Sequence, residues 1–403
     1  MSQVTEVDGR TAAEAEDHVS SLVDRLLAEH PPATTSARDF LGAQFDAGLA
    51  WVHFPVGHGG LGYGPKLQRL VNERLVDAGA PSAYPRNPIG HGMGAPTVVA
   101  HGSEAQKARY LRPLFTGEEI WCQMFSEPGA GSDVASLSCT ATRDGDEWTL
   151  NGQKVWTSLA HVARFGMIIA RTDPDKPKHK GLTYFVVDMH APGVDVRPLR
   201  QITGDAEFNE VFLADVRVPD AERLGDVGDG WRVSLTTLMN ERVSIGGSIP
   251  PREGGVIREA LKVWRREGLT DPVKRDQLVK LWIDAEVIRL TNIRASQLRS
   301  SGTPGPEGSV GKALSAEHNK AVMSFVVELL GASGMLYSSY DGGSTANAMV
   351  WDIPQRGFLR MRANSIEGGT TEIMKNILGE RVLGLPGDVR VDKELPWREV
   401  PRN

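Results

Sequence analysis

The stretch WCQMFSEPGAGSDVASLSCTATRDGDEWTLNGQKVWTSLA, residues 121–160, lies where the pattern of the chain changes. Before it, apolar residues recur at intervals of three and four, which is typical of amphipathic helices. The clearest cases are AEAEDHVSSLVDRLLAEH (13–30), PKLQRLVNERLVDAG (65–79) and EAQKARYLRPLFTG (104–117). From this stretch onward, short β-branched and aromatic runs such as FGMIIART (165–172) and GLTYFVVDM (181–189) predict strands.

After GDVGDG (225–230) the helical period returns and continues in long segments toward the end of the chain. We therefore expect a mostly α chain with a central β-barrel: an N-terminal helical domain (1–119), a middle antiparallel β domain (120–228) and a C-terminal helical bundle (229–403). Asn151-Gly152 is a strong two-residue hairpin signal and predicts a turn between EWTL and QKVWTS. GHGGLG (57–62) matches a dinucleotide-binding pattern but lacks the βαβ context, so a turn before a helix is the better interpretation.

Composition narrows the range of partners. The chain has 403 residues, a formal net charge of -6 and 24% charged residues of mixed sign, which disfavours nucleic acid and membrane surfaces as partners. Its two cysteines, Cys122 and Cys139, form neither a CxxC motif nor a His/Cys cluster, so no metal site and no disulfide framework is expected. With no leader-like or membrane-spanning run, we expect a soluble cytoplasmic protein.

The loop SEPGAGSD (126–133) carries the first chemical signal. Its small residues and hydroxyls can wrap a flat polar ring or a pyrophosphate with backbone N–H groups. Further along, Trp156 supplies an aromatic wall and Ser158 a hydroxyl, which together suit a heteroaromatic cofactor. Taken singly, the loop would be a capped turn and Trp156 a core residue, so the combination is what predicts a binding site.

Five segments together resemble the acyl-CoA dehydrogenase family over nearly the whole chain. They are AGLAWVHFPVGHGGLG (47–62), HGSEAQKARYLRPLFTGEEIWCQMFSEPGAGSD (101–133), LNGQKVWTS (150–158), GDGWRVSLTTLMNERVSI (228–245) and SIEGGTTEIMKNILGERVLGLP (365–386). The resemblance implies a non-covalent FAD between the middle barrel and a C-terminal four-helix bundle, and α,β-dehydrogenation of an acyl-CoA to a trans-2-enoyl-CoA in fatty acid or lipid metabolism. It implies that Phe125 and Ser126 meet the flavin, that Trp156 and Ser158 cover its other side, and that Ser132 lies along the CoA arm or the pyrophosphate.

Two glutamates are candidates for the catalytic base. In the larger branch of the family the base directly precedes Gly-Thr in the last loop, where this chain has Gly368 and not Glu367. In a branch resembling isovaleryl-CoA dehydrogenase the base precedes an arginine on the first bundle helix, as Glu241 precedes Arg242 here. One residue of extended chain turns a side chain to the other face, so we favour Glu241 and keep Glu367 as the alternative.

With Glu241 as the base, the resemblance implies that the amide of Gly368 polarises the thioester carbonyl, that Thr370 and Glu372 contact FAD, and that Arg242 lies near the substrate mouth. It implies electron-transferring flavoprotein as the electron acceptor. An oxidase or monooxygenase on the same scaffold and a non-catalytic partner subunit are the alternatives. The family's Arg-x-x-Phe-Gly segment is missing from REGLTDPVKRD (266–276), so homodimer, homotetramer and mixed-subunit assemblies all stay open.

Overall fold

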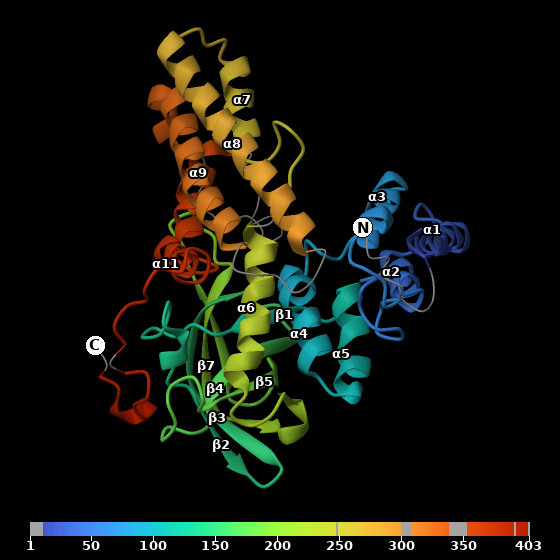
Figure 1. The fold of residues 1–403 in the computed structure, drawn as a ribbon, viewed down its shortest axis with the longest axis vertical. Helices are drawn as coiled ribbons and strands as arrows, with labels where there is room; N and C mark the ends of the chain where they lie inside the picture. Colours follow the sequence, from blue (N-terminus) through green and yellow to red (C-terminus); the bar gives the residue numbers. More distant parts are fainter. Residues whose placement is uncertain (1–10, 247–248, 300–307, 338–352, 391, 402–403) are drawn as a thin grey trace.

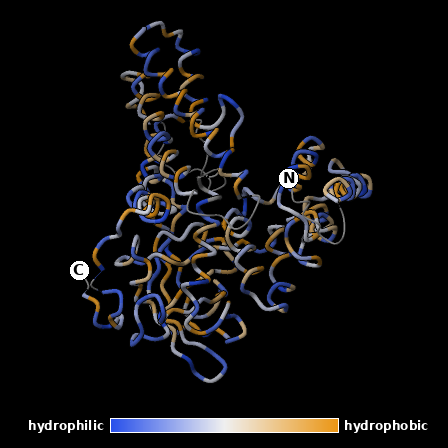
Figure 2. The backbone as a smooth tube through the Cα atoms, in the orientation of Figure 1, coloured by the Kyte–Doolittle hydropathy of each residue, from blue (hydrophilic) through white to orange (hydrophobic). Residues whose placement is uncertain are grey.

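The computed structural model describes residues 11–246, 249–299, 308–337, 353–390 and 392–401. Helices come first, a sheet follows and helices return, in the order expected from the sequence. Figure 1 shows the sheet low in the view, the N-terminal helices on one side of it, and the later helices rising above it. Figure 2 shows apolar residues concentrated where the sheet and the helices meet.

The N-terminal helices begin at well-defined caps. Thr11, Ser36 and Ser103 each accept a backbone N–H with the side-chain oxygen at the start of a helix, which satisfies one of the free amides there. One helix ends at Gly117, whose φ of 73° is the left-handed conformation that glycine adopts without strain. The helices are α1 (Ala12–Glu29), α2 (Ala37–Asp46), α3 (Leu67–Asp77), α4 (Ala95–His101) and α5 (Glu104–Thr116), with a π-helical turn, η1, at Gly90–Gly94.

The middle region is an eight-stranded mixed sheet. Its strands are β1 (Trp121–Met124), β2 (Thr140–Asp144), β3 (Glu147–Ser158), β4 (Phe165–Arg171), β5 (Leu182–Asp188), β6 (Val194–Leu199), β7 (Phe208–Pro219) and β8 (Arg223–Leu224). The order is β6-β7-β3-β2-β4-β5-β8, and β1 pairs with β4. One apolar core lies between this sheet and α4, α5 and α6, and a second lies among the strands on its other side.

Two parts of the predicted middle domain are wrong. The sheet is not closed into a barrel, because β6 and β8 end its order, and β8, only two residues long, is followed by the linker 225–229 and then a helix. The sheet is also not wholly antiparallel, since β1 runs parallel to β4 and β2 makes one parallel pair with it. The β2–β3 hairpin lies between β1 and β4 in the sequence. After this hairpin the chain comes back beside β1, and β4 therefore runs in the same direction as β1.

The hairpin predicted at Asn151-Gly152 is also wrong, because β3 runs straight through both residues. The turn lies at Gly145, with Asp144 paired to Glu147. Asn151-Gly152 instead marks a β-bulge against β7. A Cβ on Gly152 would lie 2.8 Å from the Cα of Cys139, so close backbone approach explains the glycine.

The later helices are α6 (Gly230–Gly246), α7 (Ile257–Arg266), α8 (Pro272–Arg299), α9 (Gly308–Leu329), α10 (Pro354–Arg360) and α11 (Thr371–Arg381). Helices α7, α8 and α9 enclose a common apolar core. Helix α6 packs on α9 but also on α4 and β5, so it connects the bundle to the sheet. Figure 1 shows α6 standing against the sheet below the other bundle helices.

Within the described ranges, no helix has the length and apolar character needed to cross a bilayer. The same residues include no cluster of three or more His, Cys, Asp or Glu side chains that could hold a metal ion. Cys122 and Cys139 are buried free thiols.

Candidate active site

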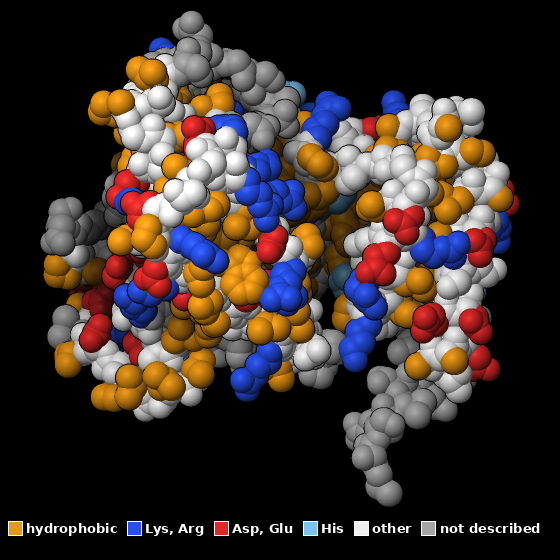
Figure 3. Space-filling view, turned by 90° about the horizontal axis from the view of Figure 1, so that it is seen from above, with side chains coloured by type: hydrophobic (Ala, Val, Ile, Leu, Met, Phe, Trp, Pro, Cys, Tyr) orange, Lys and Arg blue, Asp and Glu red, His pale blue; other side chains and the backbone are white. Residues whose placement is uncertain are grey.

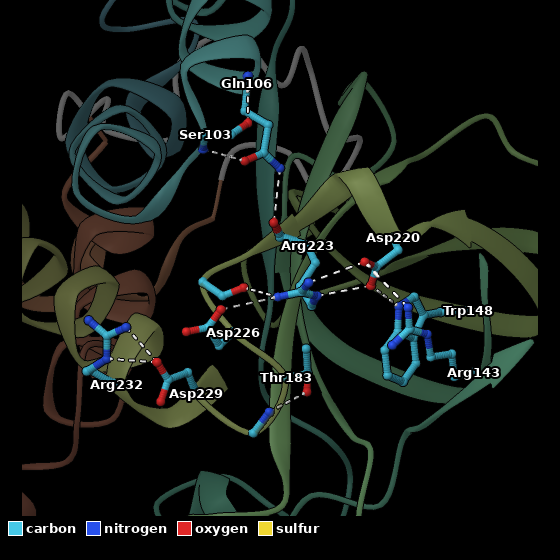
Figure 4. A network of polar contacts seen from close by, with 12 residues as sticks. Ser103, Gln106, Arg143, Trp148, Thr183, Asp220, Arg223, Asp226, Asp229 and Arg232 are labelled. Carbon is cyan, nitrogen blue, oxygen red and sulfur yellow. Dashed lines mark hydrogen bonds and ion pairs between the residues drawn. The ribbon is translucent and has the colours of Figure 1, made fainter. Parts of the chain in front are cut away.

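The linker that leads from the sheet into α6 is fixed by the polar network drawn in Figure 4. Arg223 donates from Nε to Asp220 at 3.0 Å, and Trp148 donates from Nε1 to the same carboxylate at 2.7 Å. These two bonds lower the pKa of Asp220 to about 2. Gln106 of α5 donates to the carbonyl oxygen of Arg223 at 3.1 Å. The start of α6 is therefore tied to both the N-terminal helices and the sheet.

A buried polar seam then sets the position of α6 along its length. Thr237 lies 2.9 Å from the hydroxyl of Thr97 on α4 and 3.1 Å from that of Tyr184 on β5. All three residues are fully buried. Since buried hydroxyls need hydrogen-bond partners, these contacts fix the position of α6 against α4 and β5. Glu241 lies one turn after Thr237, on the same side of the helix.

Glu241 is the more isolated of the two candidate bases. Its Oε2 accepts one hydrogen bond, from Nε2 of Gln123 on β1, at 3.2 Å. Burial raises the pKa of Glu241, and the nearby charge of Glu367 adds to that effect, while Gln123 and Arg242 oppose it. Among the residues that the structure describes, no ion pair to Glu241 is found, and a carboxylate that has lost hydration is a stronger proton acceptor than an exposed one.

Glu367 lies in the same electrostatic neighbourhood but is already engaged. Arg360 donates to its two oxygens at 3.3 and 3.1 Å, and Asn364 donates to Oε1 at 2.7 Å. Arg360 also contacts Glu207 at 3.2 Å, at the start of β7. A forked arginine contact stabilises the ionised carboxylate and fixes its direction. This arrangement favours a structural role for Glu367.

The turn after Glu367 contains two consecutive glycines in the left-handed region. Gly368 has a φ of 66° and Gly369 a φ of 93°. The buried Lys312 of α9 donates to the carbonyl oxygen of Gly369. Thr370 then caps α11, accepting the N–H of Ile373 at 3.2 Å. The predicted oxyanion amide of Gly368 thus lies in a turn held at both ends.

The rest of the predicted set around that turn is more exposed. Glu372 is an exposed side chain in the first turn of α11. Arg242 is half-buried beside Glu241, and burial lowers the pKa of its guanidinium while Glu241 raises it. Helix α6 therefore places a cation directly after the candidate base.

The predicted cofactor loop is built on a buried ion pair. Lys154 is fully buried, and its Nζ lies 2.8 Å from Glu127, 3.1 Å from the carbonyl oxygen of Phe125 and 2.9 Å from that of Ile169. Glu127 in turn accepts the backbone N–H groups of residues 138 and 139, at 2.6 and 2.9 Å. The ion pair therefore joins both ends of the loop to strands β3 and β4.

The loop residues predicted to meet the flavin lie at the edge of this core. Phe125 is buried, with its ring edge-on to Tyr184 at 5.7 Å. Ser126 is half-buried and accepts the N–H of Val155 through its carbonyl oxygen at 2.9 Å. Ser132, farther along the loop, is exposed. The loop is thus anchored at Phe125 and open to ligands at Ser132.

Trp156 has an unusual position for a tryptophan in a strand. Its side chain is 60% exposed and its φ is 61°, a strained conformation for a bulky residue. The strand bulges between Lys154 and Thr157, which turns Trp156 out of the sheet. Ser158 is half-buried two residues later. Strain that exposes a large aromatic ring is typical of a ligand-binding wall.

Aromatic contacts connect this wall to the two glutamates. The ring of Trp156 lies edge-on to Phe208 at 6.1 Å, and the guanidinium of Arg360 lies 5.6 Å from the centre of the Phe208 ring. Arg360 then holds Glu367, whose charge acts on Glu241. The structure therefore brings the candidate bases and the predicted aromatic wall, Trp156, into one region.

Sequence reasoning missed Gln123, Lys154, Lys312 and Arg360, which position the predicted residues. Lys154 could have been found, because it occupies an inward position on a strand where an apolar residue is expected. Gln123 has no such signal, since its partner Glu241 is distant in the sequence. Arg360 lies only seven residues before Glu367, but no local pattern indicates that the two side chains pair, and its second partner, Glu207, is distant.

The residues present fit a flavin. An exposed aromatic ring, an exposed loop hydroxyl at Ser132 and a half-buried glycine turn are groups that a flat ring with a pyrophosphate arm can use. Figure 3 shows a hollow between the N-terminal helices and the rest of the molecule, with apolar side chains along it.

Comparisons with known proteins agree with this architecture. Family models described as the N-terminal, middle and C-terminal domains of acyl-CoA dehydrogenase match residues 9–118, 122–216 and 228–383. The chain is 43% identical to acyl-CoA dehydrogenase FadE34 of Mycobacterium tuberculosis, over 85% of this chain but only 45% of that protein. It is 38% identical to acyl-CoA dehydrogenase IpdE1 of the same organism, over 85% of this chain and 86% of that protein.

Two solved structures show the same fold. A protein named the Tcur3481-Tcur3483 steroid ACAD has a TM-score of 0.71 and 25% identity, covering 95% of this chain and 100% of that one. The ChsE4-ChsE5 complex from Mycobacterium tuberculosis has a TM-score of 0.69 and 26% identity, covering 96% of this chain and 100% of that one.

Proposed function

Because the chain belongs to the acyl-CoA dehydrogenase family, we propose that it dehydrogenates an acyl-CoA thioester to a trans-2-enoyl-CoA, with Glu241 as the base. The family is one of FAD enzymes. The observation that carries the assignment of the base is the contrast between two neighbouring carboxylates. Glu367 is held by Arg360 and Asn364, whereas Glu241 is half-buried and, among the residues that the structure describes, has Gln123 as its one hydrogen-bond partner.

Removal of the α-proton requires a carboxylate that is ionised and directed at the substrate. Burial of Glu241 raises its pKa and so strengthens it as an acceptor, and Gln123 limits the rotation of the carboxylate. The carboxylate of Glu367 is engaged by Arg360 and Asn364 and is therefore not free to turn toward a substrate. These features support Glu241 over the alternative.

The negative charge that develops on the thioester oxygen needs hydrogen-bond donors. We assign this role to the backbone amide of Gly368, in the left-handed turn that Lys312 and the cap of α11 hold. The positive charges of Lys312 and Arg242 lie close enough to lower the pKa of Glu241 and add to the electrostatic stabilisation of an anion.

FAD, when bound, supplies the acceptor for the β-hydride. Phe125 and Ser126 would meet the flavin ring, Trp156 and Ser158 would cover its other side, and Thr370 and Glu372 would contact the cofactor near α11. Ser132, exposed on the loop, would lie along a pyrophosphate. Electron-transferring flavoprotein is the acceptor that we expect to reoxidise the flavin.

One experiment tests the function as a whole. The purified chain should be yellow, should release FAD and not FMN on denaturation, and should lose its flavin absorbance when mixed anaerobically with a suitable acyl-CoA. One solved relative is named a steroid ACAD, so the substrate panel should hold ring-bearing acyl groups beside straight and branched ones.

The outcomes separate the alternatives. Bleaching followed by rapid reoxidation in air would indicate an oxidase or a monooxygenase. Bound FAD that no acyl-CoA bleaches would indicate a non-catalytic partner subunit. Colourless protein that FAD cannot reconstitute would contradict the proposal.

An apolar stripe on α8 supports assembly. Val279, Ile283 and Val287 are about half exposed and lie on one face of the helix, with Leu290 extending the stripe. We expect a second chain of this fold to cover it, either another copy or a related subunit, since one solved relative is a two-protein complex.

Sedimentation velocity tests this expectation. The wild-type chain should sediment as an oligomer, and Ile283→Asp should shift it toward monomer because a charge cannot be buried without a partner. Val273→Asp, an exposed position off the stripe, is the matched control and should leave the assembly unchanged. A wild-type monomer at micromolar concentration would contradict the expectation.

A further inference from the structure

The segment from Asp392 to Val400 returns from the helical region to the middle sheet, as Figure 1 shows beside the C-terminal label. Pro396 bridges to Pro177, and the N–H of Trp397 donates to the carbonyl oxygen of Lys176 at 2.9 Å. The segment therefore lies along the connection between β4 and β5, and we call it the strap.

The side chain of Trp397 extends from the strap to the turn that follows the predicted cofactor loop (126–133). It is only 9% exposed, and its indole N–H donates to the carbonyl oxygen of Ser136 at 3.2 Å. The guanidinium of Arg171 lies 4.7 Å from the centre of the indole ring and donates from Nη2 to the carbonyl oxygen of Ala135 at 2.6 Å. Indole and guanidinium thus hold two successive carbonyl groups of a 3₁₀ turn, η2 (Val134–Ser136), that directly follows the loop.

A second link runs through Lys178. Its Nζ lies 2.8 Å from Asp392 in the strap and 2.7 Å from Asp133 in the loop. Asp133 also accepts the hydroxyl of Ser136 at 2.6 Å. Because Asp133 directly follows Ser132, this ion-pair bridge connects the strap to the residue next to the expected pyrophosphate contact.

We propose that the strap holds the Ser132 loop in the conformation that receives a pyrophosphate-bearing ligand, and that Trp397 is its positioning residue. This inference rests on the proposed function for the identity of the ligand. The pyrophosphate can belong to FAD or to the CoA arm of the substrate, and both carry the same chemistry. Trp397 acts through the backbone of Ala135 and Ser136, and it needs no contact with either ligand.

The test compares Trp397→Ala with Arg398→Ala. Arg398 is the neighbouring strap residue, and its side chain pairs with the exposed Asp175 at 2.8 Å, away from the loop. We expect Trp397→Ala to weaken FAD binding or to raise the KM for acyl-CoA by about 10-fold with kcat little changed, since one hydrogen bond and one cation–π contact are lost. The FAD dissociation constant and the KM identify which pyrophosphate the loop receives.

Hydrogen exchange gives a readout that does not depend on activity. Amides of residues 129–138 should exchange faster in Trp397→Ala than in the wild type or in Arg398→Ala. Should Trp397→Ala fail to fold, Trp397→Phe keeps an aromatic ring over Arg171 and loses only the hydrogen bond. It should then raise the FAD dissociation constant or the KM for acyl-CoA by about 3-fold, with faster exchange of the same amides.

Equal exchange and equal ligand constants in the Trp397 and Arg398 variants would overturn the proposal, as would a loss of kcat with both constants unchanged. A wild-type chain that binds neither FAD nor acyl-CoA would overturn the proposed function, and the exchange data would still decide whether the strap holds the loop.

Discussion

Glu241→Gln should slow reduction of the bound flavin by a good acyl-CoA at least ~100-fold, the lower range for loss of a general base. Glutamine keeps the size of the side chain and can still pair with Gln123, but it cannot accept the α-proton. Substrate should still bind and perturb the flavin spectrum. Stopped-flow reduction under anaerobic conditions measures the rate, after bound FAD has been quantified.

Glu367→Gln is the matched control, because it makes the same change in the neighbouring carboxylate. Its effect should be milder, since the contacts that Glu367 makes with Arg360 and Asn364 are structural. Abolished reduction in Glu367→Gln with near-normal reduction in Glu241→Gln would exchange the two roles. The glycine turn would then have to direct Glu367 toward the substrate.

The pH dependence provides a second check on the same residue. Burial raises the pKa of Glu241 above the ordinary value of 4.5, and only the ionised form can accept a proton. The rate of flavin reduction should therefore fall as the pH drops through this raised pKa. A folded-state pKa that is raised also means that the ionised side chain destabilises the protein at neutral pH, so Glu241→Gln should melt no lower than the wild type there.

For the loop that contains Glu367 and Gly368, the sequence predicts which residue occupies the position of a catalytic base, but it does not predict the contacts that orient Glu367. Counting from Gly-Thr places Gly368 where a loop base would be, and the engagement of Glu367 by Arg360 supports the interpretation that Glu367 is a neighbour of the base. The arginine itself was not predicted: Arg360 lies only seven residues before Glu367, but no sequence pattern shows that their side chains pair, and its contact with Glu207, just before β7, forms only in the folded chain.

The middle domain shows where local signals mislead. Both Asp144-Gly145 and Asn151-Gly152 are strong hairpin signals, but only the first is a turn. The second glycine is required by the approach of Cys139 from a neighbouring segment, which no local pattern reveals. Likewise, strand composition indicates a sheet, whereas closure into a barrel depends on long-range pairing of β6 and β8.

The buried pair of Lys154 and Glu127 leads to the second large effect. Lys154→Met removes the charge but keeps much of the side-chain volume, and it leaves the Glu127 carboxylate buried without its cation. Breaking such a pair costs about 3–5 kcal/mol of the free energy of unfolding, which for a chain of 403 residues corresponds to a fall of about 4–6 °C in melting temperature. The loop also loses the donor to the carbonyl oxygen of Phe125, so bound FAD should fall as well.

Thermal melting and the flavin-to-protein ratio measure both consequences of Lys154→Met. Lys180→Met makes the same substitution at an exposed lysine before β5 and should leave both quantities unchanged. Adding Glu127→Gln to Lys154→Met should restore part of the melting temperature, because the uncompensated charge is gone while an amide oxygen can still accept one of the two backbone N–H groups that Glu127 holds. FAD binding should recover less than stability, since the double variant still lacks the ammonium group that joins Phe125 to β4. A single variant as stable as Lys180→Met, or a double variant less stable than Lys154→Met, would show that the charge of Lys154 does not support the loop.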